Sequence, residues 1–238
     1  MEGVKSGRML YVASDIHGEY ELFLALLKKI NFSNQDKMII CGDIIDKGPN
    51  SIRLAQFIFR QPNIQCILGN HEYAFLQYYW SMMKAVSHNF DGVLQKLQEY
   101  FANDGYLLDW ETVDEFEKLP LYIEEEEFIC VHAGVPLDAD GKLPKLHEVE
   151  VQQLLYDRNF KEPHVLPKGS KCVLFGHTPT MYVSDKAQIL RYPKIPNPKK
   201  INDYYKIHLD MGTMFNGVLG CLCVDTGEEF YVSYATRR

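Results

Sequence analysis

Histidine and carboxylate residues recur along this chain in short motifs that also contain a glycine. Each motif follows a short apolar run that predicts a β-strand, so each places a polar side chain where a strand ends. The glycine permits a tight turn or a close backbone approach beside that side chain. The five motifs are 14–18, 42–48, 69–72, 131–134 and 175–179.

These motifs predict a metal site. A lone histidine is usually a structural residue, but ligand types at five successive strand ends are difficult to attribute to packing. Burying Asp15, Asp43 and Asp46 together would be unfavourable without cations to compensate their charges. The set combines carboxylate, amide and imidazole groups without thiolate, which suits manganese, iron or zinc better than calcium. The candidate metal ligands are Asp15, His17, Asp43, Asn70, His132 and His177.

Asp43 stands in the middle of this series and is the natural bridge between two cations. Two cations that share a carboxylate lie roughly 3.5–4 Å apart, and together they clamp a phosphate and generate hydroxide at neutral pH. We therefore expect two divalent ions as cofactors, with manganese first and iron or zinc as alternatives. The expected chemistry is hydrolysis of a phosphate ester.

Alternating strands and helices must position these motifs. Strand–helix–strand units of about 30 residues in the first half predict a parallel sheet with right-handed crossovers. Ligand sites in such sheets lie at the carboxyl ends of the strands. The predicted strands are 9–14, 37–41, 65–68, 121–123, 128–131, 172–175, 206–209, 218–224 and 229–234, and the predicted helices are 20–30, 51–60 and one that begins near 71.

Three segments between these elements have patterns of their own. The segment from about 73 to 118 is helical and rich in aromatic residues near its start, which predicts core packing or, alternatively, a cap beside the site. The glutamates 124–127 predict a solvated hairpin turn. Segment 191–200 has three prolines and four basic residues and predicts a solvated loop, or a basic loop that contacts phosphate. We expect one domain over 1–238.

Composition limits the partners. The formal net charge of −7 disfavours nucleic acid as a bulk electrostatic partner, although bound cations can reverse the local field at a site. No stretch approaches the roughly 20 apolar residues that span a bilayer, and the first residues lack a signal-peptide pattern. The six cysteines lie in or beside apolar runs, which predicts buried free thiols and a cytoplasmic location. The pair 221 and 223 could hold a soft metal but lacks a second pair.

The motifs resemble those of calcineurin-like metallophosphoesterases in the phosphoprotein phosphatase superfamily, especially the small bacterial and bacteriophage Ser/Thr phosphatases. The resemblance runs from Tyr11 to about Val224, in the expected order and spacing. It implies an α/β fold, a four-layer α-β-β-α sandwich of two mixed sheets flanked by helices. It also implies that Asp15 and His17 bind the first metal and that Asp43 bridges. The implied ligands of the second metal are Asn70, His132 and His177.

The resemblance implies further roles around the metals. His71 matches the general acid that protonates the leaving oxygen, and Asp46 matches the carboxylate that orients it. Arg158 resembles an arginine that grips the substrate phosphate, with a surface salt bridge as the alternative. Together with Asn70 and Lys47 it would contact phosphate, while a metal-bridging hydroxide attacks phosphorus in line. Segment 210–213 resembles a late family segment that follows a strand, and we interpret it as structural support rather than as a ligand.

Lys47 departs from the family pattern, which usually has Asp-Arg-Gly at this point. A lysine offers one compact charge in place of a planar fork, so we expect lower precision toward phosphomonoesters or a different substrate. The triplet 70–72 and Asp46 favour phosphoserine or phosphothreonine in proteins as substrate. Segment 47–51 resembles the symmetrical diadenosine tetraphosphate hydrolases, which are the alternative. A non-catalytic phosphate-binding protein is a third interpretation, disfavoured because every ligand is present.

Overall fold

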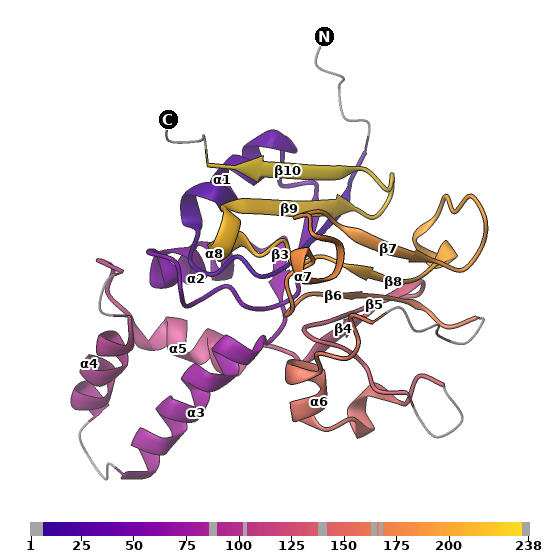
Figure 1. Cartoon of the computed structure of the whole chain (residues 1–238). Coiled ribbons are helices and arrows are strands. Elements are labelled where there is room, and N and C mark those ends of the chain that lie inside the picture. Colours follow the sequence, from indigo (N-terminus) through magenta and orange to yellow (C-terminus); the bar gives the residue numbers. More distant parts are fainter. Residues whose placement is uncertain are drawn as a thin grey trace.

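Ten short strands form two β-sheets in the computed structural model, which describes residues 7–85, 90–101, 104–137, 142–162, 166 and 169–234. The strands are β1 (Leu10–Ala13), β2 (Lys37–Ile40), β3 (Ile64–Cys66), β4 (Tyr122–Glu124), β5 (Phe128–Val131), β6 (Cys172–Phe175), β7 (Leu190–Pro193), β8 (Tyr204–His208), β9 (Val218–Cys223) and β10 (Glu229–Ser233). The first sheet has the order β10-β9-β1-β2-β3 and the second β4-β5-β6-β8-β7 (Figure 1). Both sheets are mixed, as expected.

The first sheet contains the parallel strands that the sequence predicts. β1, β2 and β3 pair in parallel, and β9 and β10 add an antiparallel hairpin on the other side of β1. Side chains alternate between the two faces of each strand, as the period of a strand requires. Val12 and Ile39 pack between the sheets against Leu174 and Ile207, whereas Tyr11 and Met38 face the outer side. The sequence therefore produces a strand buried on both faces.

Helices cover the outer faces of both sheets. The helices are α1 (Tyr20–Lys29), α2 (Ser51–Phe59), α3 (Asn70–Ala85), α4 (Phe90–Tyr100), α5 (Trp110–Glu117), α6 (Val151–Tyr156), α7 (Met181–Ser184) and α8 (Thr213–Asn216), with single 3₁₀ turns at Leu146–Glu148 and Ile201–Asp203. α1 and α2 pack on the first sheet, and Leu154 of α6 packs on Val173 of the second. The α-β-β-α sandwich is thus confirmed. Among the described residues, every helix is too short or too polar to cross a bilayer.

The segment 73–118 forms parts of three helices, which extend to the lower left in Figure 1. Residues 86–89 and 102–103 within it lie outside the described part of the chain. Phe75 of α3 is fully buried, and its ring centroid lies 5.2 Å from those of both Phe101 and Phe116. The three helices therefore pack on one another through an aromatic core. A cap function for this segment and the single-domain organisation stay predictions.

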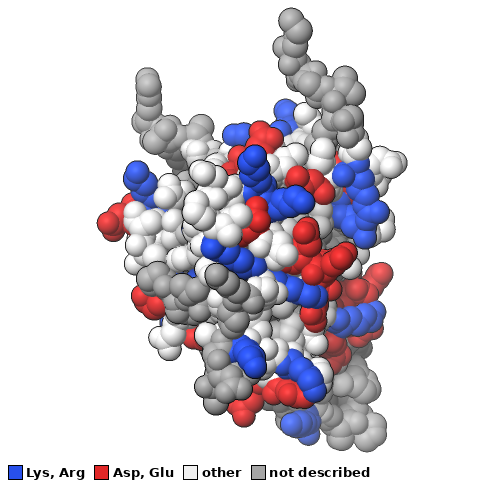
Figure 2. All heavy atoms as spheres, turned by 90° about the vertical axis from the view of Figure 1, so that its right-hand side faces the viewer, with Lys and Arg blue, Asp and Glu red and all other residues white. Residues whose placement is uncertain are grey.

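The expectation of a solvated loop over 191–200 is wrong for its first three residues. They belong to β7, which pairs antiparallel with β8. Arg191 donates to the carboxylate of Glu229 at 2.7 and 2.8 Å and to the carbonyl of Gly227 at 2.6 Å, so its partly exposed charge is paired within the fold. Figure 2 shows basic and acidic side chains interspersed on the face of the molecule that lies to the right in Figure 1. β4 and β5 form the hairpin expected around the four glutamates, with Glu124 inside the strand.

Candidate metal centre

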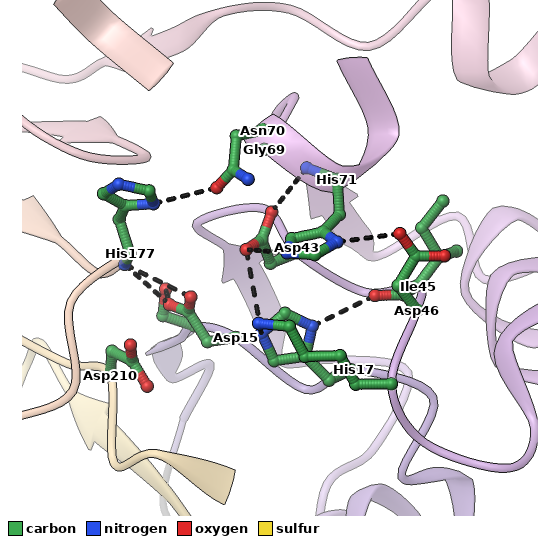
Figure 3. A network of polar contacts seen from close by, with 12 residues as sticks. Asp15, His17, Asp43, Ile45, Asp46, Gly69, Asn70, His71, His177 and Asp210 are labelled. Atoms are coloured by element: carbon green, nitrogen blue, oxygen red, sulfur yellow. Dashed lines mark hydrogen bonds and ion pairs between the residues drawn. The ribbon is translucent and has the colours of Figure 1, made fainter. Parts of the chain in front are cut away.

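The six predicted ligands meet where the parallel strands of the two sheets end. Asp15 and His17 follow β1, and Asp43 follows β2 after two residues. Asn70 is the first residue of α3, beyond the end of β3. His132 and His177 follow β5 and β6 of the second sheet. Figure 3 shows Asp43 at the centre, with His71 and His17 on one side and His177 and Asp15 on the other.

Asp43 belongs to two groups of potential ligands. Its carboxylate and nitrogens of His17 and His71 all lie within 4.8 Å of one another, and so do its carboxylate and nitrogens of His132 and His177. The Oδ2 atom of Asp43 lies 3.7 Å from Nε2 of His17, and Oδ1 lies 3.4 Å from Nε2 of His132. One buried carboxylate therefore lies between a first cluster, with His17 and His71, and a second cluster, with His132 and His177. This is the geometry expected of a bridge.

Backbone carbonyls orient two of the imidazole rings. Nδ1 of His17 lies 3.1 Å from the carbonyl of Ile45, and Nδ1 of His132 lies 2.8 Å from the carbonyl of Cys41. A carbonyl only accepts, so each Nδ1 carries the proton and each Nε2 presents its lone pair to the site. Burial followed by the charge of Lys47 lowers the pKa of His17 to about 3. The rings are thus neutral and ready to bind a cation.

Several acceptor atoms converge in the second cluster. The Nε2 lone pair of His132 faces Oδ1 of Asn70 at 2.9 Å and Oδ1 of Asp43 at 3.4 Å. Burial followed by the charge of His177 lowers the pKa of His132, so this nitrogen does not gain a proton to relieve the contact. Nε2 of His177 is buried and has no hydrogen-bond partner among the described residues. Acceptors this close repel one another unless a cation lies among them, so these residues fit a divalent ion.

Asp15 is buried beside the second cluster but lies outside both groups. Its two carboxylate oxygens accept the backbone N–H of His177 at 3.2 and 3.1 Å, and the hydroxyl of Ser14 donates to it. Burial, then the charges of Asp210 and Asp43, raise the pKa of Asp15 well above its ordinary value. Burial also raises the pKa of Asp43 to about 8. Burial thus disfavours the charged form of both carboxylates, and a bound cation would stabilise that form, which is further evidence that the site fits cations.

The backbone of the site adopts conformations that side chains usually avoid. Nine described non-glycine residues have positive φ, and six of them are site residues. Strained backbone of this kind persists where the surrounding structure enforces it, and it concentrates at functional sites. The six are Asp15, His17, Asp43, Asp46, Lys47 and His177, with φ between 50° and 68°. Gly176 is required beside them, because a Cβ there would overlap the carboxylate of Asp15 and the hydroxyl of Ser14.

Glu72 organises these loops, a structural role that the sequence motifs do not predict. Its side chain is fully buried and accepts backbone N–H groups from Asp43 at 2.8 Å, Ile44 at 2.8 Å, Ile45 at 3.1 Å and Gly69 at 2.9 Å. The loops after β2 and β3 are thereby joined through one carboxylate. The only sequence signal for this role is a charged residue three positions after Gly69, at the start of a predicted helix.

The remaining predicted residues surround the two clusters. Nδ1 of His71 donates to Oδ2 of Asp46 at 2.7 Å. Burial lowers the pKa of His71, but the hydrogen bond with Asp46 and the charge of Asp43 outweigh it and raise the pKa. Nζ of Lys47 lies 3.3 Å from Nε2 of His17. Arg158 is exposed after α6, and its charge, after burial, contributes to lowering the pKa of His177 to about 4.

Asp210 also lies at this site. From the sequence alone, its segment 210–213 is interpreted as structural support. It is buried next to Asp15 (Figure 3), and its carboxylate accepts the backbone N–H of Gly212 at 2.7 Å. Burial raises its pKa to about 7. Its position two residues after β8, at the end of another strand of the second sheet, was the available signal.

A family model for calcineurin-like phosphoesterases matches residues 9–201. The chain belongs to the calcineurin-like phosphoesterase family. The match covers most of the chain, including β1 to β7 and every residue of the two clusters. This phosphoesterase is a hydrolase, and the interpretation as a non-catalytic binding protein is not supported.

Curated relatives of the phosphoesterase carry the name bis(5'-nucleosyl)-tetraphosphatase. The symmetrical enzyme of Buchnera aphidicola (subspecies Schizaphis graminum) is 30% identical over 155 residues, 63% of this chain and 54% of that protein. That of Coxiella burnetii is 30% identical over 190 residues, 76% and 58% of the two chains. The asymmetrical enzyme PrpE of Bacillus cereus is 23% identical over 234 residues, 87% of both. The chain spans about half the length of the Buchnera relatives.

Solved structures share the fold of the phosphoesterase. One, named as a candidate diadenosine tetraphosphatase, superposes with a TM-score of 0.67 and 16% identity over 96% of this chain and 94% of that one. A metallophosphoesterase from Sphaerobacter thermophilus superposes with a TM-score of 0.55 and 14% identity over 98% and 90%. At this identity the likeness concerns the fold alone.

Proposed function

We propose that this phosphoesterase hydrolyses dinucleoside tetraphosphates with the help of two divalent cations. The single observation that carries the choice of substrate is the name shared by relatives that match between 63% and 87% of the chain. From the sequence motifs alone, this substrate is the second candidate, after phosphoproteins. The position of Asp43 in both ligand groups supports a pair of cations.

The proposed metal ligands are the six residues expected from the sequence. Asp43 would bridge, Asp15 and His17 would hold one ion, and the clustered acceptors of the second group would hold the other. When bound, the ions would neutralise charge on the phosphate and lower the pKa of a water molecule. Manganese is the first candidate, with iron or zinc as alternatives. The ligands proposed for the second ion are Asn70, His132 and His177.

Two basic side chains would bind the substrate phosphates. Lys47 is exposed and lies beside His17, at the edge of the first cluster. Arg158 is exposed beside the second cluster, where its guanidinium can hold two phosphate oxygens. His71 would donate a proton to the departing oxygen, since its Nδ1 proton is held by Asp46 and its Nε2 lies 3.9 Å from Asp43.

An exposed aromatic ring beside the site supports a nucleotide substrate. Tyr156, the last residue of α6, is 37% exposed, and its ring centroid lies 6.2 Å from that of His177. Stacking of a base on an aromatic ring contributes about 1–3 kcal/mol and tolerates any base. A nucleoside could therefore lie against Tyr156 while the adjoining phosphates reach the metal centre.

A Ser/Thr protein phosphatase is the second candidate, and the contact between His71 and Asp46 favours it. An alkoxide is a poor leaving group and needs a proton, whereas a nucleoside diphosphate leaves as a stable anion. An oriented imidazole supported by a carboxylate 2.7 Å away is therefore of greatest use with phosphoserine or phosphothreonine.

The test presents both substrate classes to the same protein. The purified chain with Mn²⁺ is incubated with diadenosine tetraphosphate and, separately, with a phosphoserine peptide, and the products are separated by chromatography. We expect faster turnover of the dinucleotide; two molecules of ADP indicate symmetrical cleavage, and ATP with AMP indicates asymmetrical cleavage. A higher kcat/KM with the phosphopeptide would reverse the order of the two candidates. Asp43→Ala is the control for a contaminating hydrolase.

A further inference from the structure

We propose that Tyr100 is a positioning residue, whose hydroxyl holds Asp46 in the orientation that directs His71 toward the site. This inference rests on the proposed roles of His71 and Asp46. The hydroxyl of Tyr100 donates to Oδ2 of Asp46 at 3.0 Å, and Nδ1 of His71 donates to the same oxygen at 2.7 Å. Two donors from different helices, α4 and α3, therefore converge on one carboxylate oxygen.

Packing within the helical segment fixes the position of the Tyr100 hydroxyl. The ring of Tyr100 lies edge-on to Phe75, at 5.6 Å between centroids, and to Phe101, at 5.0 Å. It also lies 5.8 Å from Tyr78 at a tilt of 31°. Phe75 is fully buried, so the contact is anchored in the aromatic core. These ring contacts restrict rotation of the Tyr100 side chain, 37% of which is exposed, and so direct its hydroxyl toward Asp46.

Asp46 needs such support because its own surroundings leave its side chain loosely held. It lies in a loop with φ of 68°, and its side chain is 20% exposed. Its backbone N–H donates to Oγ of Ser51 at 3.0 Å, which fixes the main chain but not the carboxylate. A pocket of about 170 Å³ adjoins Asp46 and Tyr100, so a released carboxylate would have space to rotate. Loss of the Tyr100 hydroxyl would therefore let the Asp46 side chain turn.

The consequence concerns the ring of His71. With Nδ1 bound to Asp46, Nε2 faces Oδ2 of Asp43 at 3.9 Å and points into the site. If Asp46 turns, the ring loses its fixed tautomer and direction, because a histidine tautomer is set by the partner of the other nitrogen. Tyr100 thus contacts Asp46, which lies 54 residues away in sequence, and through it links the helical segment to the proton donor.

The kinetic test removes only the hydroxyl. Tyr100→Phe keeps the ring, and Tyr78→Phe removes a hydroxyl from a neighbouring ring of the same aromatic group as the matched control. Both are assayed with Mn²⁺ on 4-nitrophenyl phosphate, which has a good leaving group, and on phenyl phosphate, which has a poorer one. We expect Tyr100→Phe to lower kcat on phenyl phosphate by about tenfold, with a smaller loss of kcat on 4-nitrophenyl phosphate and unchanged KM. Tyr78→Phe should have the kcat and KM of wild type on both esters.

Two further measurements separate positioning from general damage. Long-range ¹H–¹⁵N NMR of the metal-free chain, at a pH high enough that His71 is neutral, should show one Nδ1-protonated tautomer of His71, and a mixture in Tyr100→Phe. Adding Tyr100→Phe to Asp46→Asn should cause no further loss of kcat, since the effect passes through Asp46. A single His71 tautomer in Tyr100→Phe, an equal loss on both esters, or additive losses would each overturn the inference.

The outcome is independent of the natural substrate. If neither dinucleotide nor phosphopeptide is hydrolysed, the proposed function fails, while the aryl phosphates and the NMR measurement still decide the role of Tyr100. If a natural substrate is confirmed and Tyr100→Phe behaves as wild type on both aryl esters with an unchanged tautomer, only the inference about Tyr100 fails.

Discussion

His71 and Asp43 lie 3.9 Å apart, yet their surroundings suit them to different tasks. His71 is held by Asp46 and is partly exposed, whereas Asp43 is buried among four histidines. We expect His71→Ala to retain Mn²⁺ binding by calorimetry and to lower kcat by about 10²–10⁴-fold. His147→Ala, which removes an exposed histidine, is the control. Near-wild-type turnover in His71→Ala would contradict the assignment of the proton donor.

Lys47 limits how the phosphate is held. Its side chain is exposed beside His17, so an arginine can be accommodated there. A guanidinium would bind two phosphate oxygens where the ammonium binds one. We expect Lys47→Arg to lower KM for an aryl phosphate by about fivefold. Lys28→Arg, at an exposed position of α1, is the control and should leave KM unchanged. Identical kcat and KM in wild type and Lys47→Arg would show that this position does not determine phosphate binding.

At the scale of elements, the start of α3 joins the loops after β2 and β3 through Glu72. Glutamine has nearly the same shape, but its amide group cannot accept the backbone N–H groups that one carboxylate oxygen now receives. We expect Glu72→Gln to lower the free energy of unfolding in urea by about 2–4 kcal/mol and to weaken Mn²⁺ binding. The exposed residue change Glu111→Gln on α5 should alter stability by less than about 0.5 kcal/mol. An unchanged urea midpoint in Glu72→Gln would remove this role.

β8 binds the segment that follows Arg158, through the side chain of Lys206. Lys206 of β8 is fully buried, and its ammonium group donates to the carbonyls of Phe160 and Glu162. Burial lowers its pKa from 10.5 to about 8. Between these pH values the unfolded chain binds more protons than the folded chain, so this residue makes stability rise with pH from about 8 to 10.5.

The variant Lys206→Met isolates this contribution from the other groups that titrate in alkali. We expect wild type to gain stability relative to Lys206→Met, by no more than about 3 kcal/mol, as pH rises from 7.5 to 10 in urea unfolding. The gain is absent below pH 8, where Lys206 is charged in both states. If the difference in free energy of unfolding between wild type and variant stays constant or falls as pH rises, the ammonium group of Lys206 does not have a lowered pKa in the folded chain.

At the scale of the molecule, the metal centre joins the two sheets. Asp15, His17 and Asp43 come from the first sheet, and His132 and His177 from the second. Bound cations should therefore stabilise the whole fold. At 100 times Kd, a ligand adds about 2.7 kcal/mol, which corresponds to a rise of about 5–10 °C in Tm for a chain of this size.

Mn²⁺ titration followed by thermal unfolding tests this link. The rise in Tm should be reversed by a chelator, disappear in Asp43→Ala and persist in Glu126→Ala, which removes an exposed carboxylate from the β4–β5 hairpin. An equal rise in Asp43→Ala would place the stabilising ions elsewhere on the protein.

The sequence by itself predicts the parallel strands of the first sheet, and through its family resemblance it also implies the sandwich and the residues that gather at its centre. Asp15 and Asp43 each follow an apolar strand of the first sheet, and parallel strands bring such ends to one edge of a sheet. That rule is local, because it needs only the order of strands and the residue after each. It therefore predicts that Asp15 and Asp43 meet without any knowledge of packing. Their meeting with His132 depends on how the two sheets pack, and only the family resemblance implies it.

Only the tertiary structure decided what supports those ligands. Tyr100 reaches Asp46 across an aromatic core, Glu72 binds loops from β2 and β3, and Asp210 lies beside Asp15. β7 formed where prolines suggested a loop, because β8 offered an edge for pairing. Such contacts depend on the distance and direction of side chains that are far apart in sequence. Helix packing sets those distances, and no local pattern of residue types records them.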